Sequence, residues 1–273
     1  MNVTLITGGS DGIGAEMARQ LAVRHGAQLA LVLAGRSQPK LEGVAAQCRA
    51  HGAQVLVVAM DVAQEAQCRS LVDQTLQQFG HLDTLVNNAG MSAQALFADV
   101  TADDLHWYED LMKVNLWGAV WCTHAALPHL VASGGRIVAV SSLAGLVGVP
   151  GRTAYSATKF AMTGFFEALR PELKGAGVSV TSAYPGVVAT AIRHRGFNAR
   201  GRPAGASGLK EDEAMSVEEC ARLIIEGMDA RRREVVMTAK GRLGRFMKLL
   251  TPGIVERLAM AVLKDEVKPR ARD

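Results

Sequence analysis

The sequence predicts an α/β protein built on a doubly wound parallel sheet, because strand-like and helix-like segments alternate along most of its length. The strand-like segments are continuous apolar runs, which is typical of strands covered by helices on both faces. The chain has 273 residues, of which 49% are hydrophobic and 5% aromatic. We therefore expect a single large domain with an aliphatic core, followed by a basic helical extension at the C-terminus.

The first half of the chain supplies four expected strands. Residues 3–9 are an apolar run that ends in glycines, which predicts a strand followed by a tight turn. Residues 14–26 have apolar positions at helical spacing, and Gly26 is expected to end that helix. The apolar run 27–36 predicts a second buried strand. The alternation then continues with a helix over 41–52, a strand over 54–62, a helix over 68–80 and a strand over 82–90.

The second half is expected to begin with one long helix over 105–130, followed by a strand within 135–145. The next expected elements are a helix that carries Tyr155 and a strand within 177–186. Residues 193–213 are rich in glycine and basic residues and only weakly periodic. Because a loop of that length in a compact domain is usually functional, we expect a substrate lid over about residues 190–214.

Composition excludes several classes of protein. The chain contains no run of 18 apolar residues, so no transmembrane helix is expected, and it opens on a strand, so we expect no secretory or transit segment before the fold. The cysteines are widely spaced, which speaks against a metal site or a disulfide framework and predicts a cytoplasmic protein. They are Cys48, Cys68, Cys122 and Cys220.

Charge is unevenly distributed along the chain. Residues 231–273 contain 12 Lys/Arg and 5 Asp/Glu, whereas residues 1–230 contain 18 and 21. Within residues 239–273, apolar residues recur among basic ones, which predicts a basic amphipathic extension to a catalytic domain over 1–238. Two interpretations stay open: the extension contacts a membrane surface peripherally, or it packs on its own subunit or a neighbouring one.

The stretch TGGSDGIG covers residues 7–14, between the first expected strand and helix. Glycines allow backbone amides to approach a pyrophosphate, and the helix N-terminus adds the positive end of its dipole. A purely structural turn is the alternative, but the position after the first strand favours a dinucleotide site. Asp11 is an acid near the expected pyrophosphate, and we expect it to cap the helix or face solvent. The site would comprise Gly8, Ser10, Asp11, Gly12, Ile13 and Gly14.

Arg36 ends the second expected strand, where NAD-preferring folds place an acidic residue for the ribose hydroxyl. No Asp or Glu occurs between Gly26 and Pro39. An arginine can instead bind a 2′-phosphate, and Ser37 offers a hydroxyl to the same group. These residues favour NADP (NADPH) over NAD, although a solvated strand end would also explain the arginine.

Tyr155 and Lys159 lie one helical turn apart if their segment is helical. One interpretation is a surface pair. The other is chemical: an ammonium beside a phenol favours the phenolate, which makes the phenol a usable general acid and base.

Five motifs occur in order: TGGSDGIG at residues 7–14, MDV at 60–62, NNAG at 87–90, YSATK at 155–159 and YPGVVAT at 184–190. With them, residues 1–235 resemble the short-chain dehydrogenase/reductase family and its Rossmann fold. The stretches YSATKFAMTGFFEALRPEL and SSLAGLVGVPG resemble its hydroxysteroid dehydrogenase-like branch, which acts on lipophilic alcohols and ketones.

The resemblance implies roles for individual residues. Tyr155 matches the general acid/base, Lys159 its lysine partner, Ser142 the hydroxyl that orients the substrate carbonyl, and Asn115 the asparagine that anchors a water. Further cofactor contacts are implied for Tyr155 and Lys159 and for Asp61, Val62, Asn88, Ala89, Gly90, Pro185, Gly186, Val188 and Thr190.

The implied activity is NADP-dependent hydride transfer between nicotinamide and a carbonyl or secondary alcohol of a small, lipophilic molecule. A non-catalytic NADP-binding regulator or scaffold, and an epimerase or dehydratase, are the alternatives. We expect neither metal nor nucleic acid to bind. Relatives are usually homodimers or homotetramers built on helices like those around Asn115 and Tyr155, and Trp117 and Trp121 are expected to pack in a core or a dimer interface.

Overall fold

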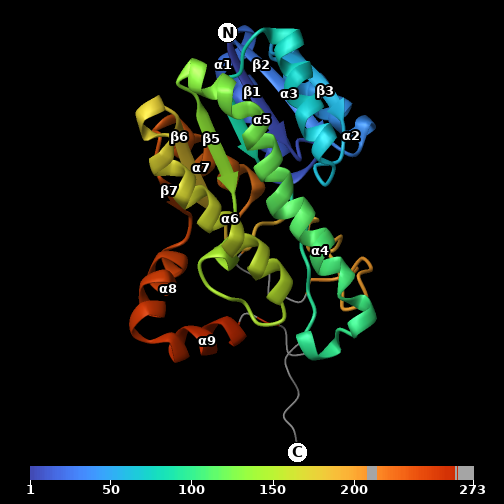
Figure 1. Ribbon diagram of the computed structural model, residues 1–273, viewed down its shortest axis with the longest axis vertical. Coiled ribbons are helices and arrows are strands. Elements are labelled where there is room, and N and C mark those ends of the chain that lie inside the picture. The colour runs from blue at the N-terminus through green and yellow to red at the C-terminus, as the bar shows by residue number, and fades with distance from the viewer. Residues whose placement is uncertain (208–213, 262, 264–273) are drawn as a thin grey trace, which may run out of the picture.

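Seven parallel strands form the centre of the molecule in the computed structural model, which describes residues 1–207, 214–261 and 263 (Figure 1). Their order is β3-β2-β1-β4-β5-β6-β7, which confirms the doubly wound parallel sheet. Winding reverses between β1 and β4, where open α/β sheets form a crevice. The strands are β1 (Asn2–Thr7), β2 (Leu29–Gly35), β3 (Gln54–Ala59), β4 (Thr84–Asn87), β5 (Arg136–Val140), β6 (Ser179–Tyr184) and β7 (Glu234–Val236).

Helices cover both faces of the sheet and divide the core into two clusters. In β1, Leu5 packs in one cluster and Ile6 in the other, because successive strand residues point to opposite faces. Both faces are therefore apolar, which explains the continuous apolar runs in the sequence. One face carries α1 (Gly12–His25), α2 (Gln38–Ala50) and α7 (Val217–Asp229); the other carries α3 (Glu65–Phe79), α5 (Gly118–Ser133) and α6 (Thr153–Glu172).

The predicted single helix over 105–130 is wrong in detail. Helix α4 (His106–Met112) and α5 are joined by a π-helical turn over Lys113–Trp117. Wide turns of this kind are common at functional sites, and this one contains the buried side chain of Asn115. Short 3₁₀ helices occupy Gly26–Gln28, Phe97–Asp99, Ala102–Asp104, Leu143–Gly145 and Lys174–Ala176.

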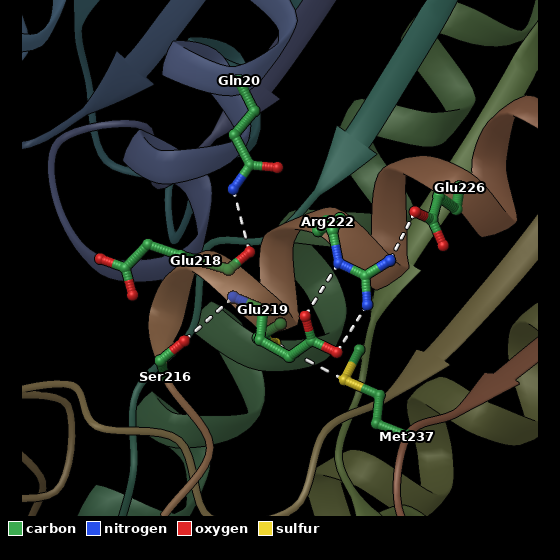
Figure 2. Close-up of polar contacts among 8 residues, drawn as sticks. Gln20, Ser216, Glu218, Glu219, Arg222, Glu226 and Met237 are labelled. Carbon is green, nitrogen blue, oxygen red and sulfur yellow. Dashed lines mark hydrogen bonds and ion pairs between the residues drawn. The ribbon is translucent and has the colours of Figure 1, made fainter.

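The sequence interpretation did not predict α7 or the short edge strand β7. Figure 2 shows how the start of α7 is fixed: the Ser216 side chain accepts a hydrogen bond from the Glu219 N–H (3.1 Å), and Arg222 pairs with Glu219. Gln20 of α1 donates to the carbonyl of Glu218 (2.9 Å). These contacts hold the first turn of α7 against α1, beside the carboxyl ends of the strands.

Two helices follow β7, α8 (Ala239–Leu250) and α9 (Pro252–Ala261), and we call them the C-terminal arm. They lie at the red end of the chain in Figure 1, away from α1 and β3. The arm confirms the predicted helical extension, of which Val262 and residues 264–273 fall outside the described residues. Its exposed apolar side chains are Leu243, Phe246, Leu249, Leu250, Ile254 and Leu258.

Two properties of the described residues bear on the class of protein. None of their helices combines the length and the apolar character needed to cross a membrane. In the same part of the chain, no group of three or more His, Cys, Asp or Glu side chains is placed to hold a metal ion.

Candidate active site

A cleft of about 980 Å³ opens at the carboxyl ends of the strands, at the winding reversal between β1 and β4. Most of the predicted site residues line it. The exceptions, which are not part of its lining, are Gly14, Ser37 and Asn115. The predicted residues that line the cleft are Gly8, Ser10, Asp11, Gly12, Ile13, Arg36, Asp61, Val62, Asn88, Ala89, Gly90, Ser142, Tyr155, Lys159, Pro185, Gly186, Val188 and Thr190.

The glycine turn between β1 and α1 takes its shape from the absence of side chains. Gly8 and Gly12 have φ of 69° and 54°, which side-chain-bearing residues rarely adopt. A Cβ on Gly14 would lie 2.4 Å from Asn88 Nδ2 and 2.5 Å from the carbonyl oxygen of Gly8. A close-packed glycine cradle at a helix N-terminus fits a pyrophosphate. The residues present therefore fit the pyrophosphate of a dinucleotide.

Asn88 ties this turn to the end of β4. Its Nδ2 donates to the carbonyl oxygens of Thr7 (3.0 Å) and Gly8 (3.1 Å). The N–H groups of Asn88 and Ala89 both donate to Thr7 Oγ1 (3.1 Å each). The two strands at the winding reversal are thereby held in one fixed arrangement beneath the cleft.

Asp11 caps α1, as predicted: its Oδ1 accepts a hydrogen bond from the Gly12 N–H (2.7 Å). Its Oδ2 lies 2.6 Å from Arg195 Nη2 and 3.9 Å from Lys40 Nζ. Partial burial opposes ionisation, but the Gly12 hydrogen bond and the charges of Arg195 and Lys40 hold the pKa of Asp11 below its ordinary value. Asp11 therefore pairs with cations from two other segments of the chain, of which Arg195 also lines the cleft.

Tyr155 and Lys159 both lie on the first two turns of α6, which begins at Thr153. The Lys159 ammonium is 5.8 Å from the centroid of the Tyr155 ring, and it donates to the carbonyl oxygen of Val140 (3.0 Å). Both side chains are buried, so the predicted pair is not a surface pair. Burial lowers the pKa of Lys159, and the charge that Tyr155 acquires on ionisation opposes that effect.

Ser142 and Asn115 approach this pair from two other elements. Ser142 follows β5 and lines the cleft, where its Oγ accepts a hydrogen bond from the Ala144 N–H (3.2 Å). Asn115 is fully buried; its Oδ1 accepts from the Met91 N–H (2.7 Å), and its Nδ2 donates to the Met91 carbonyl and Thr158 Oγ1 (2.9 Å each). Asn115 therefore fixes the chain after β4 against α6.

The described part of the predicted lid is hydrogen-bonded to the segment that follows β4. Phe197 N–H donates to the Ser92 carbonyl (2.9 Å), and Gln94 N–H donates to the Phe197 carbonyl (2.8 Å). Arg193 is buried and donates to the carbonyl of Val188 (3.0 Å), so it is not a solvated loop residue. Residues 208–213 of the predicted lid lie outside the described residues.

Several cleft residues were not predicted from the sequence. Arg152 is the most notable, because it stands three residues before Tyr155 and is buried against it. A capping box at Ser216 and Glu219 could have located the start of α7, but no sequence signal places the arm at the cleft. The unpredicted lining includes Met91, Ser92, Arg152, Arg193, Met215, Ser216, Glu219, Thr238, Lys240, Ala259 and Ala261.

The chain that forms this cleft matches a known protein family. Residues 2–200 match the family model described as short chain dehydrogenase. The chain belongs to the short-chain dehydrogenase/reductase family. Membership supports a dehydrogenase/reductase whose Rossmann fold binds a nicotinamide cofactor.

Similar short-chain dehydrogenases come from distant organisms. The chain is 38% identical over 238 residues to the 11-beta-hydroxysteroid dehydrogenase of Pinus massoniana, and this match covers 82% of the chain but 64% of the pine protein, slightly less than two thirds. A short-chain dehydrogenase/reductase from Burkholderia phymatum, in complex with NAD, superposes with a TM-score of 0.80 at 25% identity and covers 99% of this chain and 98% of that one. An alcohol dehydrogenase from Thermococcus sibiricus, complexed with 5-hydroxy-NADP, gives a TM-score of 0.71 at 25% identity, with coverage of 86% and 94%.

Proposed function

We propose that the protein is an NADP-dependent oxidoreductase that interconverts a carbonyl and a secondary alcohol on a lipophilic small molecule, with Tyr155 as general acid and base. The observation that carries this proposal is the convergence of Ser142, Tyr155 and Lys159 on one cleft with the glycine cradle. A regulator without turnover would have no chemical need for a buried lysine beside a buried tyrosine.

The residues of the chain handle the proton of the reaction. Ser142 Oγ orients the substrate oxygen, and the Tyr155 hydroxyl donates a proton to that oxygen in reduction or accepts one in oxidation. Lys159 stabilises the phenolate that remains. The nicotinamide cofactor, when bound, supplies or accepts the hydride. General acid–base assistance of this kind is worth about 10²–10⁴-fold in rate.

Arg36 is the residue that supports NADP as the preferred cofactor. It lies at the carboxyl end of β2 and lines the cleft, and the sequence between Gly26 and Pro39 contains no acid. Arg36→Asp should shift cofactor preference toward NAD, measured as the ratio of kcat/KM for the two cofactors. An unchanged ratio would remove Arg36 from this role.

Apolar residues around Ser142 and Tyr155 support a lipophilic substrate. Leu143, Ala144 and Val149 line this end of the cleft, together with Ala259 and Ala261 of the arm. The pine relative named as a hydroxysteroid dehydrogenase supports the same substrate class. Hydroxysteroids and aliphatic secondary alcohols should therefore have a lower KM than short polar alcohols.

The central experiment follows NADPH absorbance with a panel of ketones, in wild type and in Tyr155→Phe. We expect turnover in the wild type, its near-complete loss in the variant, and equal NADPH binding by calorimetry in both. Binding without any turnover in the wild type would favour the regulator. Substrate conversion without net cofactor oxidation would favour an epimerase or dehydratase.

The C-terminal arm supports a second proposal, that residues 239–273 contact a membrane peripherally while residues 1–238 form the catalytic domain of a cytoplasmic protein. Phe246 and Leu249 are 63% and 80% exposed on the arm beside basic residues. The Phe246→Ser/Leu249→Ser variant should lose co-sedimentation with anionic liposomes at low salt, as should a chain truncated before Lys240. Val23→Ser, which alters an equally exposed residue of α1, is the matched control. Equal recovery of all proteins in the supernatant would end this proposal.

We also propose a homodimer or homotetramer built on the helices around Asn115 and Tyr155. Trp117 is 46% exposed and stacks on Trp121 (ring centroids 5.8 Å apart), so an apolar aromatic pair borders α5 on the surface. Light scattering of Trp117→Glu should report a smaller assembly than the wild type. An unchanged mass would exclude this face as the interface.

A further inference from the structure

Arg152 carries a buried charge directly beside Tyr155. Its guanidinium carbon lies 4.3 Å from the centroid of the Tyr155 ring, closer than the 5.8 Å of the Lys159 ammonium. Arg152 is 8% exposed, as buried as Tyr155 itself. An arginine in this position over an aromatic ring makes a cation–π contact that holds the ring in place.

The partners that hold Arg152 are uncharged. Its Nε donates to the carbonyl of Ala93 (3.3 Å) and its Nη2 donates to Ser92 Oγ. Within the part of the chain that the structure describes, no carboxylate pairs with it. Because a buried charge without a counter-charge is costly, this arrangement needs an explanation beyond the anchoring of a loop.

We propose that Arg152 is a positioning residue that acts through Tyr155, by fixing the ring and by stabilising its phenolate together with Lys159. This inference deepens the proposed function and rests on the role assigned to Tyr155 there. The phenolate is the anion that can form next to Arg152 during the reaction, so the two cations would hold it from two sides.

The charges around Tyr155 are consistent with this role. Burial lowers the pKa of Arg152, the charge of ionised Tyr155 opposes that lowering, and the nearby charge of Arg193 adds to it. Arg152 before α6 and Lys159 on α6 are the cations that lie against the ring, and Arg193, which follows β6, acts on Arg152. The neutral side chains of Ser92 and Ser142 line the same cleft.

Three variants separate the charge of Arg152 from its structural contacts. Arg152→Met removes the charge and keeps the length, whereas Arg152→Lys keeps the charge. Ser92→Ala is the matched control, because it removes a hydrogen bond to Arg152 and leaves the charge in place. Arg152→Gln, which is neutral but can still donate to Ala93, replaces the methionine variant if that protein does not fold. Thermal melts and NADPH binding establish that each variant is folded.

The first readout is the pH dependence of kcat/KM for alcohol oxidation, in which Tyr155 must be the phenolate. Loss of a neighbouring cation makes ionisation of the phenol harder, so Arg152→Met should move the pH midpoint of kcat/KM upward by about one unit, the lower end of the effect of a nearby opposite charge. Below the midpoint this lowers kcat/KM about tenfold. Arg152→Lys and Ser92→Ala should stay near the wild-type midpoint.

The second readout needs no turnover. The chain has three tyrosines, so the near-ultraviolet absorbance of tyrosinate can be titrated with and without Tyr155→Phe, and the difference gives the ionisation of Tyr155. The same upward shift is expected in Arg152→Met, even if the proposed substrate class proves wrong. An unmoved midpoint in both readouts would overturn the proposal and leave a structural arginine. A KM that rises only for ketones carrying a carboxylate, with no change in the pH midpoint, would also overturn the proposal. Arg152 would then be a residue that binds an anionic substrate.

Discussion

Replacing Gly14 with alanine tests the glycine cradle most directly. The added Cβ would lie 2.4 Å from Asn88 Nδ2 and 2.5 Å from the Gly8 carbonyl oxygen. Unstrained non-bonded contacts are about 3.5 Å or longer, so the turn, the first turn of α1 or the Asn88 side chain must move by about 1 Å. The backbone oxygen of Gly8 cannot swing aside as a flexible side chain would.

The expected magnitude combines three terms. Overpacking of a core position costs about 1–3 kcal/mol, weakened hydrogen bonds of Asn88 add about 1 kcal/mol, and the helix propensity of alanine offsets about 1 kcal/mol. We therefore expect Gly14→Ala to lose about 1–3 kcal/mol of stability. For a chain of 273 residues, that loss lowers the Tm by roughly 2–5 °C.

The matched control is Gly43→Ala in the interior of α2, where an added Cβ meets nothing within 4 Å. This control should be stabilised by about 0.5–1 kcal/mol. Thermal unfolding and calorimetric titration with NADPH should show Gly14→Ala melting below the wild type and binding at least tenfold more weakly, since the backbone that faces the phosphates is displaced. If Gly14→Ala has the same Tm as the control and the same NADPH affinity as the wild type, the close packing of Gly14 is not required for the fold or for the cofactor site.

Three further substitutions probe the charges and the buried amide of the site. Lys159→Met should stabilise the cofactor-free protein by about 1–2 kcal/mol, because it removes a buried charge. Burial lowers the folded-state pKa of Lys159, so the gain in stability should be full below that pKa and shrink as the pH rises toward the unfolded value of 10.5. Urea unfolding over a pH series measures this dependence. Asp11→Asn removes a negative charge near the expected pyrophosphate and an exposed ion pair with Arg195. NADPH should therefore bind about two- to fivefold more tightly to the variant at low salt. High salt screens the charge, so calorimetric titration there should give equal affinities for the variant and the wild type. Asn115→Ala leaves the Met91 N–H and carbonyl without their hydrogen-bond partners. The variant should lose about 2–4 kcal/mol of stability in denaturant unfolding and have a lower kcat. A variant as stable as the wild type would contradict the bridging role of Asn115.

Local sequence patterns predicted the sheet and many of the strand ends that line the cleft. Strand ends such as Asn88 and Arg36 follow apolar runs, and parallel strands bring such ends to one edge. Tyr155 and Lys159 were placed on one helix by their spacing, and α6 has that geometry. In these cases the sequence pattern that predicts a site residue lies within a few positions of that residue.

The remaining features depend on contacts between distant segments. Arg152 is buried by Ser92 and Ala93, about sixty positions earlier in the chain, and its sequence neighbours give no sign of that contact. The π-helical turn around Asn115 has the same apolar pattern as a regular helix, so periodicity predicted one helix across it. Helix α7 is different: its capping box and apolar positions were present in the sequence and were overlooked.

The strand order has a consequence for biosynthesis. β1 pairs with β2 and with β4, which is made some eighty positions later, and the cleft wall is finished only when Ala259 and Ala261 have been added. A nascent chain leaving the ribosome therefore has no complete nucleotide pocket until most of it has been synthesised. Bound cofactor can stabilise the finished protein through mass action, but it cannot protect the exposed strand edges of an unfinished chain from aggregation.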